Sequence, residues 1–469
     1  MTKPDASTTP ADTIFVLFGA TGDLAKRLVL PAFYELASTG LLPTNWRLVG
    51  NGRGDVSHLD FRQHVRDVLT EFSSIGDEGQ WEEFRDHLYF AGGGFAADDP
   101  GSLLDVLDEA RRELPDAALV HYFAVPPVAF SGLTRALGEH DLAKDSRVVY
   151  EKPFGTSRAA FHELDQVVHE VLDESQVYRI DHFLGKEGTQ QLHVLRFGNA
   201  LASGIWDREH VSSVQIDVPE TLDIADRAEF YDATGAVLDM LVTHLFQVAA
   251  EVAMEPPASL SAQNLQSARE QIIARFRPLD PGDVVLGQYD GYRQTAGVAQ
   301  DSSTDTFVAA KLWIDTDRWR GVPFLLRTGK MLARSAQRVS LVLRDPDGPL
   351  SDIPPHGNVL TFSLSDAGEI DAALVVKQPG PNLALEVAHA QVPLAKLDGA
   401  EPLKPYTRLI HDVLLGDRSL FTRPDGLEHV WAVADPIITN PPKIQSYSPG
   451  SWGPDAAAKL AGPDGWLLS

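Results

Sequence analysis

The sequence has 469 residues, 43% of them hydrophobic, and it carries a formal net charge of −26. A chain of this length exceeds what one hydrophobic core usually holds, so we expect two large domains. The strong acidity makes nucleic acid and anionic membranes poor partners, because both bind basic surfaces. The absence of cysteine excludes disulfides, thiolate metal sites and cysteine nucleophiles, and it favours a cytoplasmic location.

The chain begins with a segment that we expect to be a flexible tail. Residues 1–12 are rich in Thr, Pro and Asp, without the basic and apolar regions of a signal peptide. No apolar run in the sequence approaches the roughly 20 residues of a membrane-spanning helix. We therefore expect no membrane partner.

Residues 13–190 alternate short apolar runs with helix-like stretches. Alternation of strands and helices at these lengths predicts a Rossmann-type, doubly wound parallel sheet. We expect this segment to be the dinucleotide-binding domain. The predicted strands are 14–18, 46–50, 118–125 and 147–150, and the predicted helices are 22–36, 60–72, 101–114 and 130–138.

The pattern changes at about residue 190, so we expect a second domain over 191–469. Residues 237–254 are apolar nearly all round, which predicts a buried helix. Spaced strand-like runs between turn residues predict a large, mostly antiparallel sheet flanked by helices. The predicted strands are 212–219, 307–314, 339–344, 357–363 and 370–377.

The turn after the first predicted strand has the spacing Gly19-x-x-Gly22-x-x-Ala25. A strand, a glycine turn and a helix N-terminus together present backbone N–H groups to a pyrophosphate. The alternative is a plain strand-to-helix turn. We favour a dinucleotide site, whose predicted residues are Gly19, Thr21, Gly22, Asp23 and Leu24.

The end of the second predicted strand indicates which dinucleotide binds. Arg53 follows this strand, and an Arg here accommodates the 2′-phosphate of NADP. Asp55 lies close and would repel that phosphate if it pointed inward, although it could simply begin the next turn. We therefore expect NADP as the cofactor, with NAD as an alternative, and no metal.

Three further positions carry groups suited to catalysis or anion binding. Lys152 follows a predicted strand, where ligands bind in such sheets, and its bond to Pro153 could be cis. His244 lies in the predicted apolar helix, where it is either a core histidine with satisfied hydrogen bonds or a functional base oriented by a carboxylate such as Asp181. The nonapeptide 179–187 places a carboxylate, an imidazole and an ammonium within six positions.

Several motifs together resemble those of the glucose-6-phosphate dehydrogenase family. They occur in family order over nearly the whole chain, and the nonapeptide is the most specific of them. The motifs are Thr21 to Arg27, Glu151 to Gly155, Arg179 to Glu187, Trp206-Asp207, Arg227 with Phe230 to Asp232, Ala253 to Pro257, Arg327 to Lys330, Gly416-Asp417 with Leu420-Phe421, and Gly450 to Pro454.

The resemblance implies oxidation of the C1 hydroxyl of glucose 6-phosphate to the lactone, with hydride transfer to a nicotinamide, and a homodimer or homotetramer. It implies that His244 is the general base and that Asp181 orients it. It also implies substrate-binding residues in both predicted domains. His182 and Lys186 would bind the phosphate, Lys152 would reach the sugar and the cofactor, Glu220 and Asp239 would accept hydrogen bonds from the sugar, and Lys330 would add positive charge.

The sequence departs from the family pattern at several polar positions. Phe183 stands where the family has Tyr, Leu28 follows Lys26-Arg27 in place of a basic residue, and Ser335 and Leu238 replace cations. These departures leave three hypotheses: a glucose-6-phosphate dehydrogenase, a paralogous dehydrogenase for another aldose or sugar phosphate, and a non-catalytic sugar-phosphate-binding relative. Retention of Asp181, Lys152 and His244 favours an enzyme.

Overall fold

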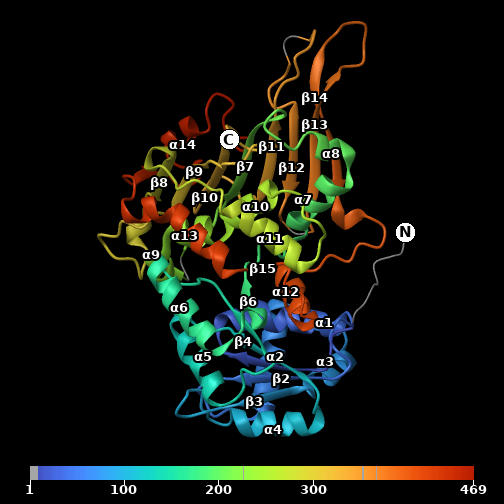
Figure 1. The fold of residues 1–469 in the computed structure, drawn as a ribbon, viewed down its shortest axis with the longest axis vertical. Helices are drawn as coiled ribbons and strands as arrows, with labels where there is room; N and C mark the ends of the chain where they lie inside the picture. Colours follow the sequence, from blue (N-terminus) through green and yellow to red (C-terminus); the bar gives the residue numbers. More distant parts are fainter. Residues whose placement is uncertain (1–8, 225–226, 351–352, 366) are drawn as a thin grey trace. The chain divides into compact units, whose positions relative to one another are not determined.

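The computed structural model describes residues 9–224, 227–350, 353–365 and 367–469 (Figure 1). Residues 1–8 of the predicted tail therefore lie outside the described residues. The chain forms two compact units, and each is built from more than one segment. Unit 1 contains Met1–Gly185, Ser261–Gln263 and Lys404–Pro424, and unit 2 contains Lys186–Leu260, Asn264–Leu403 and Asp425–Ser469.

Unit 1 is built on a seven-stranded sheet in the order β15-β6-β5-β4-β1-β2-β3. All strands run parallel except the edge strand β15, which pairs antiparallel with β6. The parallel part has the strand order of a doubly wound dinucleotide-binding sheet, so the predicted Rossmann-type fold is confirmed. The strands are β1 (Thr13–Phe18), β2 (Trp46–Asn51), β3 (Leu88–Ala91), β4 (Ala118–Phe123), β5 (Arg147–Tyr150), β6 (Val177–Ile180) and β15 (Phe421–Thr422).

Helices bury both faces of this sheet, which is why its strands are mostly apolar. On one face, Phe15 and Leu17 of β1 belong to a core that includes Phe33 of α1 and Leu409 of α12. On the other face, Phe18 packs edge-on against Phe123. The helical segments are η1 (Ala25–Val29), α1 (Leu30–Ser38), α2 (His58–Phe72), α3 (Glu78–Arg85), α4 (Leu103–Glu113), η2 (Pro127–Ala129), α5 (Phe130–Glu139), α6 (Arg158–Val171), η3 (Glu174–Gln176) and α12 (Pro405–Leu415).

The two units and the predicted domains differ in one long segment. Residues 404–424, which supply α12 and β15, belong to unit 1, whereas the domain predicted from the sequence after residue 190 includes them. The reason is that a pattern along the sequence does not reveal a segment that returns to an earlier sheet. The predicted boundary itself falls close to the change of unit between Gly185 and Lys186.

Unit 2 is built on a nine-stranded sheet in the order β14-β13-β12-β11-β7-β10-β9-β8-β16. Neighbouring strands are antiparallel except for the pairs β7–β10 and β8–β16, so the predicted mostly antiparallel sheet is confirmed. The strands are β7 (Val211–Pro219), β8 (Val284–Tyr289), β9 (Phe307–Leu312), β10 (Phe324–Gly329), β11 (Arg338–Leu343), β12 (Asn358–Ser363), β13 (Glu369–Lys377), β14 (Leu385–Pro393) and β16 (Gln445–Tyr447).

The two faces of this sheet are covered differently. Helical segments α7 and η5 contact strands β12 and β10 respectively. The C-terminal residues pack against Arg327 of β10. Its guanidinium donates to the carbonyl of Leu468 and lies over the ring of Trp466. The helical segments are α7 (Glu187–Gly198), α8 (Ala200–Gly204), α9 (Ala228–Ala236), η5 (Val237–Leu245), α10 (Phe246–Ala253), α11 (Ala262–Ile273), η6 (Pro281–Asp283), η7 (Tyr292–Gln294), η8 (Leu394–Lys396), α13 (Pro424–Thr439) and α14 (Asp455–Leu460).

The helical stretch 228–253, made of α9, η5 and α10, is long and apolar enough in composition to cross a membrane. However, 94% of its most apolar window is buried inside the protein. This is the pattern of a core helix, and it agrees with the buried helix predicted for residues 237–254.

Candidate functional site

The predicted dinucleotide loop lies between β1 and η1 in unit 1. Gly19 has a φ of 73°, a conformation that favours glycine, and a Cβ there would lie 2.4 Å from the carbonyl oxygen of Ala124. The Gly22 N–H donates to the Gly19 carbonyl over 2.8 Å and closes the turn. Thr21 and Asp23 are exposed on the loop. The turn therefore has the shape that lets a pyrophosphate approach backbone N–H groups at a helix start.

The predicted 2′-phosphate residue stands at the carboxyl end of β2. Arg53 and Asp55 are both exposed there, two and four residues after the end of the strand at Asn51. Lys152 is half-buried two residues after the end of β5, which β4 and β1 separate from β2, and the Lys152–Pro153 peptide is cis. These residues follow the carboxyl ends of parallel strands, which is where ligands bind in open sheets of this type.

A buried carboxylate beside Lys152 was missed by the sequence analysis. Glu151 is 3% exposed and accepts a hydrogen bond from the Tyr122 hydroxyl over 2.6 Å. The Tyr406 hydroxyl of α12 donates to its other oxygen over 3.4 Å. Burial raises the pKa of Glu151 to about 7, although the bond from Tyr122 and the charge of Lys152 oppose that rise. A glutamate in a short motif gives no signal of burial, so only the fold reveals this group.

Asp181 and His182 follow β6 at the same edge of the unit 1 sheet. Asp181 is 1% exposed, and its Oδ1 accepts the backbone N–H of Phe183 over 2.9 Å. The half-buried ring of His182 stacks on Tyr406, with ring centroids 6.2 Å apart. Tyr406 lies far along the sequence in α12, so sequence spacing could not associate it with the nonapeptide.

The last predicted phosphate residue of the nonapeptide belongs to unit 2. Lys186 is 9% exposed and stands at the N-terminus of α7, where its carbonyl accepts the N–H of Thr189 over 3.0 Å. A helix N-terminus attracts anions, so a phosphate bound to the Lys186 ammonium would also interact favourably with the start of α7.

Two other predicted substrate residues of unit 2 lie together. Glu220 follows β7 and Lys330 follows β10, and because these strands are parallel neighbours their carboxyl ends coincide. The Lys330 ammonium forms an ion pair with Glu220 and lies 5.6 Å from the ring centre of Tyr231. Burial raises the pKa of Tyr231 well above its usual value, and the carboxylate of Asp239 raises it further. Tyr231 therefore belongs to this group. It is not among the predicted site residues, although it lies in the family-like motif Phe230-Tyr231-Asp232.

Asp239 and His244 lie on η5, a π-helical segment rather than an α-helix. Both are buried, with 7% and 0% of their surface exposed. A π-helix closes hydrogen bonds between residues five apart, and the Phe246 N–H accordingly donates to the Leu241 carbonyl. Asp239 and His244 are five positions apart, so this geometry brings them to one side of the segment. In an α-helix they would differ by roughly 140° around the axis.

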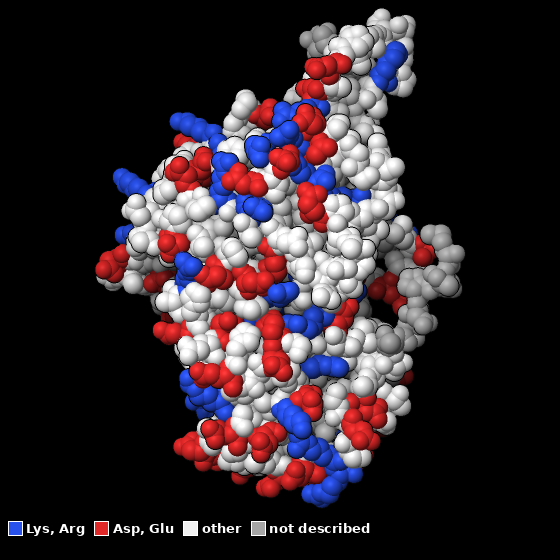
Figure 2. Space-filling model, in the orientation of Figure 1, with Lys and Arg blue, Asp and Glu red and all other residues white. Residues whose placement is uncertain are grey.

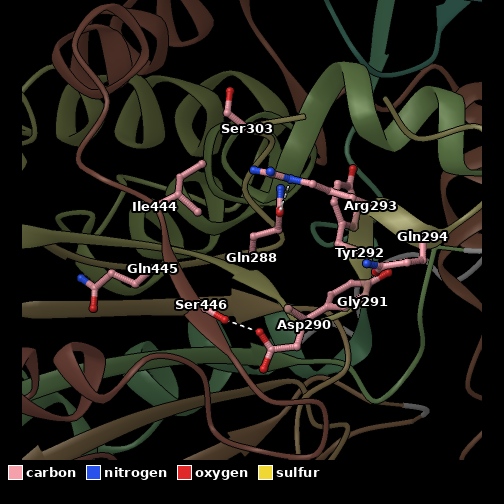
Figure 3. Close-up of a pocket in the computed structure, with 11 residues that line it drawn as sticks. Gln288, Asp290, Gly291, Tyr292, Arg293, Gln294, Ser303, Ile444, Gln445 and Ser446 are labelled. Carbon is pink, nitrogen blue, oxygen red and sulfur yellow. Dashed lines mark hydrogen bonds between the residues drawn. The ribbon is translucent and has the colours of Figure 1, made fainter. Parts of the chain in front are cut away.

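A separate hollow in unit 2 contains none of the predicted site residues. It has a volume of about 290 Å³ between β8, η7 and β16 (Figure 3). Its walls are tied by hydrogen bonds from Arg293 to Gln288 over 3.2 Å and from Ser446 to Asp290. Exposed polar groups that bond one another in this way show no sign of a ligand site.

The fold and the placed residues define a class of protein. Unit 1 has the sheet order and the glycine turn of a dinucleotide-binding domain, and unit 2 contributes the buried imidazole of His244 and the Lys330–Glu220 ion pair. That combination is typical of a two-domain oxidoreductase that uses a nicotinamide cofactor. The chain belongs to the glucose-6-phosphate dehydrogenase family: the models of its NAD binding domain and C-terminal domain match residues 16–191 and 193–467.

Similar proteins carry the same family name. The chain is 35% identical to glucose-6-phosphate 1-dehydrogenase 1 of Mycobacterium tuberculosis, over 97% of this chain and 96% of the relative. It is 34% identical to glucose-6-phosphate 1-dehydrogenase of Aggregatibacter actinomycetemcomitans, over 96% of both chains. The crystal structure of the Mycobacterium avium enzyme matches with a TM-score of 0.88 at 32% identity, covering 98% of this chain and 99% of that one. A glucose-6-phosphate dehydrogenase in complex with glucose 6-phosphate matches with a TM-score of 0.91 at 28% identity, covering 99% of this chain and 100% of that one.

Proposed function

We propose that the protein oxidises the C1 hydroxyl of D-glucose 6-phosphate to 6-phosphoglucono-lactone, as the entry step of the pentose phosphate pathway, with NADP as the hydride acceptor. Family membership over both units carries this proposal. It is supported by the retention of Asp181, His182, Lys186 and His244 in the family motifs.

In the proposed reaction, His244 accepts the proton of the C1 hydroxyl while C1 loses hydride. A neutral imidazole suits this task because its ordinary pKa lies near the operating pH. Its complete burial keeps competing water away from the proton-accepting nitrogen. Asp181 is proposed to orient the imidazole, a role that rests on the family motif. The nicotinamide cofactor supplies the hydride-accepting ring.

The substrate is proposed to be held through its phosphate and its ring hydroxyls. His182 and Lys186 would supply charge-assisted hydrogen bonds to the phosphate, and Lys152 would reach the sugar and the cofactor. Asp239 and the Glu220–Lys330 pair would hold the ring hydroxyls. The pairing of Glu220 with Lys330 supports this, because the ion pair fixes the direction in which the carboxylate accepts hydrogen bonds.

The choice of NADP over NAD is a proposal that rests on Arg53 at the end of β2. Its exposed guanidinium has the chemistry to bind a 2′-phosphate bidentately. Gly19, Thr21, Gly22, Asp23 and Leu24 are proposed to line the pyrophosphate, and the tight approach of Gly19 to Ala124 fits this use. We also propose a homodimer or homotetramer located in the cytoplasm, acting without nucleic acid or membrane.

A substrate panel tests the proposal. Reduction of NADP and of NAD is followed with glucose 6-phosphate, glucose and galactose 6-phosphate. We expect the highest kcat/KM with glucose 6-phosphate and NADP. Faster turnover of another aldose would favour the paralogue hypothesis, to which the departures Phe183, Leu28 and Ser335 point. Binding without turnover of any of the three would favour a non-catalytic relative.

A further inference from the structure

The start of the π-helical segment η5 depends on a residue from another part of unit 2. Gly235, with φ 64° and ψ 178°, breaks the helix between α9 and η5. Ala236 then occupies the N-cap position, where a methyl side chain cannot accept a hydrogen bond. The first N–H groups of η5 therefore need an acceptor from elsewhere.

Asp305 supplies that acceptor. Its Oδ2 accepts the Val237 N–H over 2.8 Å, and its main-chain carbonyl accepts the Ala236 N–H over 2.9 Å. The approach is close, because a Cβ on Gly235 would lie 2.7 Å from Asp305 Oδ1. The glycine thus leaves the space that the carboxylate occupies.

The segment that carries Asp305 is itself rigidly held. Thr306 donates its N–H to the Gly287 carbonyl of β8 over 2.7 Å, and its own carbonyl accepts the Lys330 N–H over 2.9 Å. Asp305 and Thr306 therefore fix the backbone at the start of η5, which carries Asp239, and also at Lys330. Neither residue is among the predicted substrate-binding residues.

We propose that Asp305 is a positioning residue that holds the first turn of η5 and thereby sets the place of Asp239 relative to the Glu220–Lys330 pair. This inference rests on the proposed function, because it takes Asp239 as a substrate-binding residue. Asp239 stands two residues after Val237 and is affected first by a loose helix start, whereas His244 lies five residues further into the buried segment.

The charge state of Asp305 supports a functional reason for its presence. Burial raises the pKa of its carboxyl to about 6, against the bonds from Val237 and Ala236 that lower it. Three phenols interact with this carboxylate, those of Tyr231 in α9, Tyr292 in η7 and Tyr447 in β16, and each has a raised pKa. The carboxylate of Asp232 in α9 lines the same hollow as Asp305. Because the folded-state pKa is raised, the contribution of this group to folding stability is lost as the pH rises through about 6. The ionised carboxylate is therefore kept at neutral pH at some cost to stability.

The test compares Asp305→Ala with Asp305→Asn, which retains an acceptor oxygen, and with Asp301→Ala as a matched change of an exposed Asp in the same loop. Loss of a helix-capping acceptor changes an equilibrium by roughly two- to thirty-fold, so we expect Asp305→Ala to raise the KM for glucose 6-phosphate by about that factor. The KM for the cofactor should stay within about twofold. Asp305→Asn should restore most of the sugar KM without lowering Tm at pH 7.5, and Asp301→Ala should resemble the wild type.

Several outcomes would overturn the inference. One is an unchanged sugar KM in Asp305→Ala, and another is an equal rise in the KM values for sugar and cofactor. A third is a fall in Tm and in the fraction of active enzyme with no change in KM, which is the result expected if Asp305 has a purely structural role. If Asp305→Ala does not fold, Asp305→Ser is measured instead, because its side chain is polar but too short to reach Val237. The variants are compared with wild type on the sugar that the wild type oxidises fastest. The wild-type substrate panel thus tests the proposed function, whereas the difference between the change in sugar KM and the change in cofactor KM tests Asp305.

Discussion

His244 is the residue on which the proposed chemistry depends most directly. Replacing it with Asn should lower kcat by ~10²–10⁴-fold, as expected for the loss of a general base, with a smaller change in KM. Asp181→Asn should also lower kcat, because the imidazole would lose its proposed orienting partner. Steady-state kinetics with glucose 6-phosphate measures both variants, and a near-normal kcat in His244→Asn would mean that another group accepts the proton.

Arg53 tests the choice of cofactor. Arg53→Ala should weaken NADP far more than NAD, by about 1.5–3 kcal/mol, the range for a hydrogen bond to a charged group. The KM values for the two cofactors at saturating sugar give the comparison. Equal losses for NADP and NAD would show that Arg53 does not contact the 2′-phosphate.

The proposed phosphate contacts are fewer than in the family pattern, because Phe183, which is 2% exposed, stands where that pattern has a tyrosine. Each remaining charge-assisted contact should therefore matter more. Lys186→Ala should raise the KM for glucose 6-phosphate strongly and leave turnover of unphosphorylated glucose nearly unchanged. An unaffected KM would remove the phosphate site from this loop.

Phe183→Tyr is the complementary change at the same site. An added hydroxyl that reached the phosphate would lower the KM for glucose 6-phosphate, by about 0.5–1.5 kcal/mol in binding. Titration of glucose 6-phosphate against this variant and wild type gives the result, with glucose as the control substrate that lacks the phosphate.

At the level of elements, strand and helix positions were largely predictable, because apolar periodicity is a local property of the sequence. β5 was predicted with its observed bounds, and the strands that became β7, β9 and β11 were placed within two residues of their observed ends. Strands of four residues carry little periodicity: β3 and β6 were missed, whereas β5 was found from its adjacent valines, which favour strands.

Two features of the candidate site could not be read from such patterns. The apolar helix 237–254 was expected to bury His244, and it does, but the π-helical form of η5 depends on packing and not on composition. The stacking of Tyr406 on His182 depends on α12 returning to unit 1 from far along the chain. Motifs are local and therefore yield candidate residues directly, whereas a group such as Asp305, the proposed positioning residue, comes from a separate segment.

Glu151, the residue after β5, makes the folding stability depend on pH. Its pKa is raised to about 7 by burial, so its contribution to folding stability is present below its ordinary value of 4.5 and is lost as the pH rises through about 7. The free energy of unfolding of Glu151→Gln minus that of wild type should therefore increase by about 3 kcal/mol between pH 4.5 and about pH 8, because the wild type loses stability over this range and the variant does not. Denaturant unfolding at both pH values measures this, and a difference that stays constant with pH would contradict it.

For the molecule as a whole, the dominant electrostatic fact is a net charge of −26. On the face shown in Figure 2 acidic and basic side chains are interspersed, so the excess of negative charge is spread out. Such an excess destabilises the compact state by self-repulsion, and salt screens it over about 10 Å at 0.1 M.

We therefore expect Tm at pH 7 to rise when KCl is increased from about 0.02 M to about 0.2 M. Calorimetry or circular dichroism gives the midpoint. The same increase in salt near the isoelectric point of about 4.9 provides the control, because the net charge disappears there. A Tm at pH 7 that falls with salt would mean that attractive ion pairs outweigh the net repulsion.

The return of residues 404–424 to unit 1 has a consequence for biosynthesis. While the ribosome is still making residues 186–403, the nascent parallel sheet has an unpaired edge at β6, and Tyr178 lacks Phe421, which packs edge-on with ring centroids 4.9 Å apart in the finished protein. Exposed strand edges promote aggregation, so this interval is when a chaperone would be needed most. A shortened polypeptide that ends at residue 185 would lack this edge strand, so unit 1 is better studied with residue 185 joined to residue 404. The two ends are close, because a Cβ on Gly185 would lie 3.0 Å from the Pro405 carbonyl oxygen.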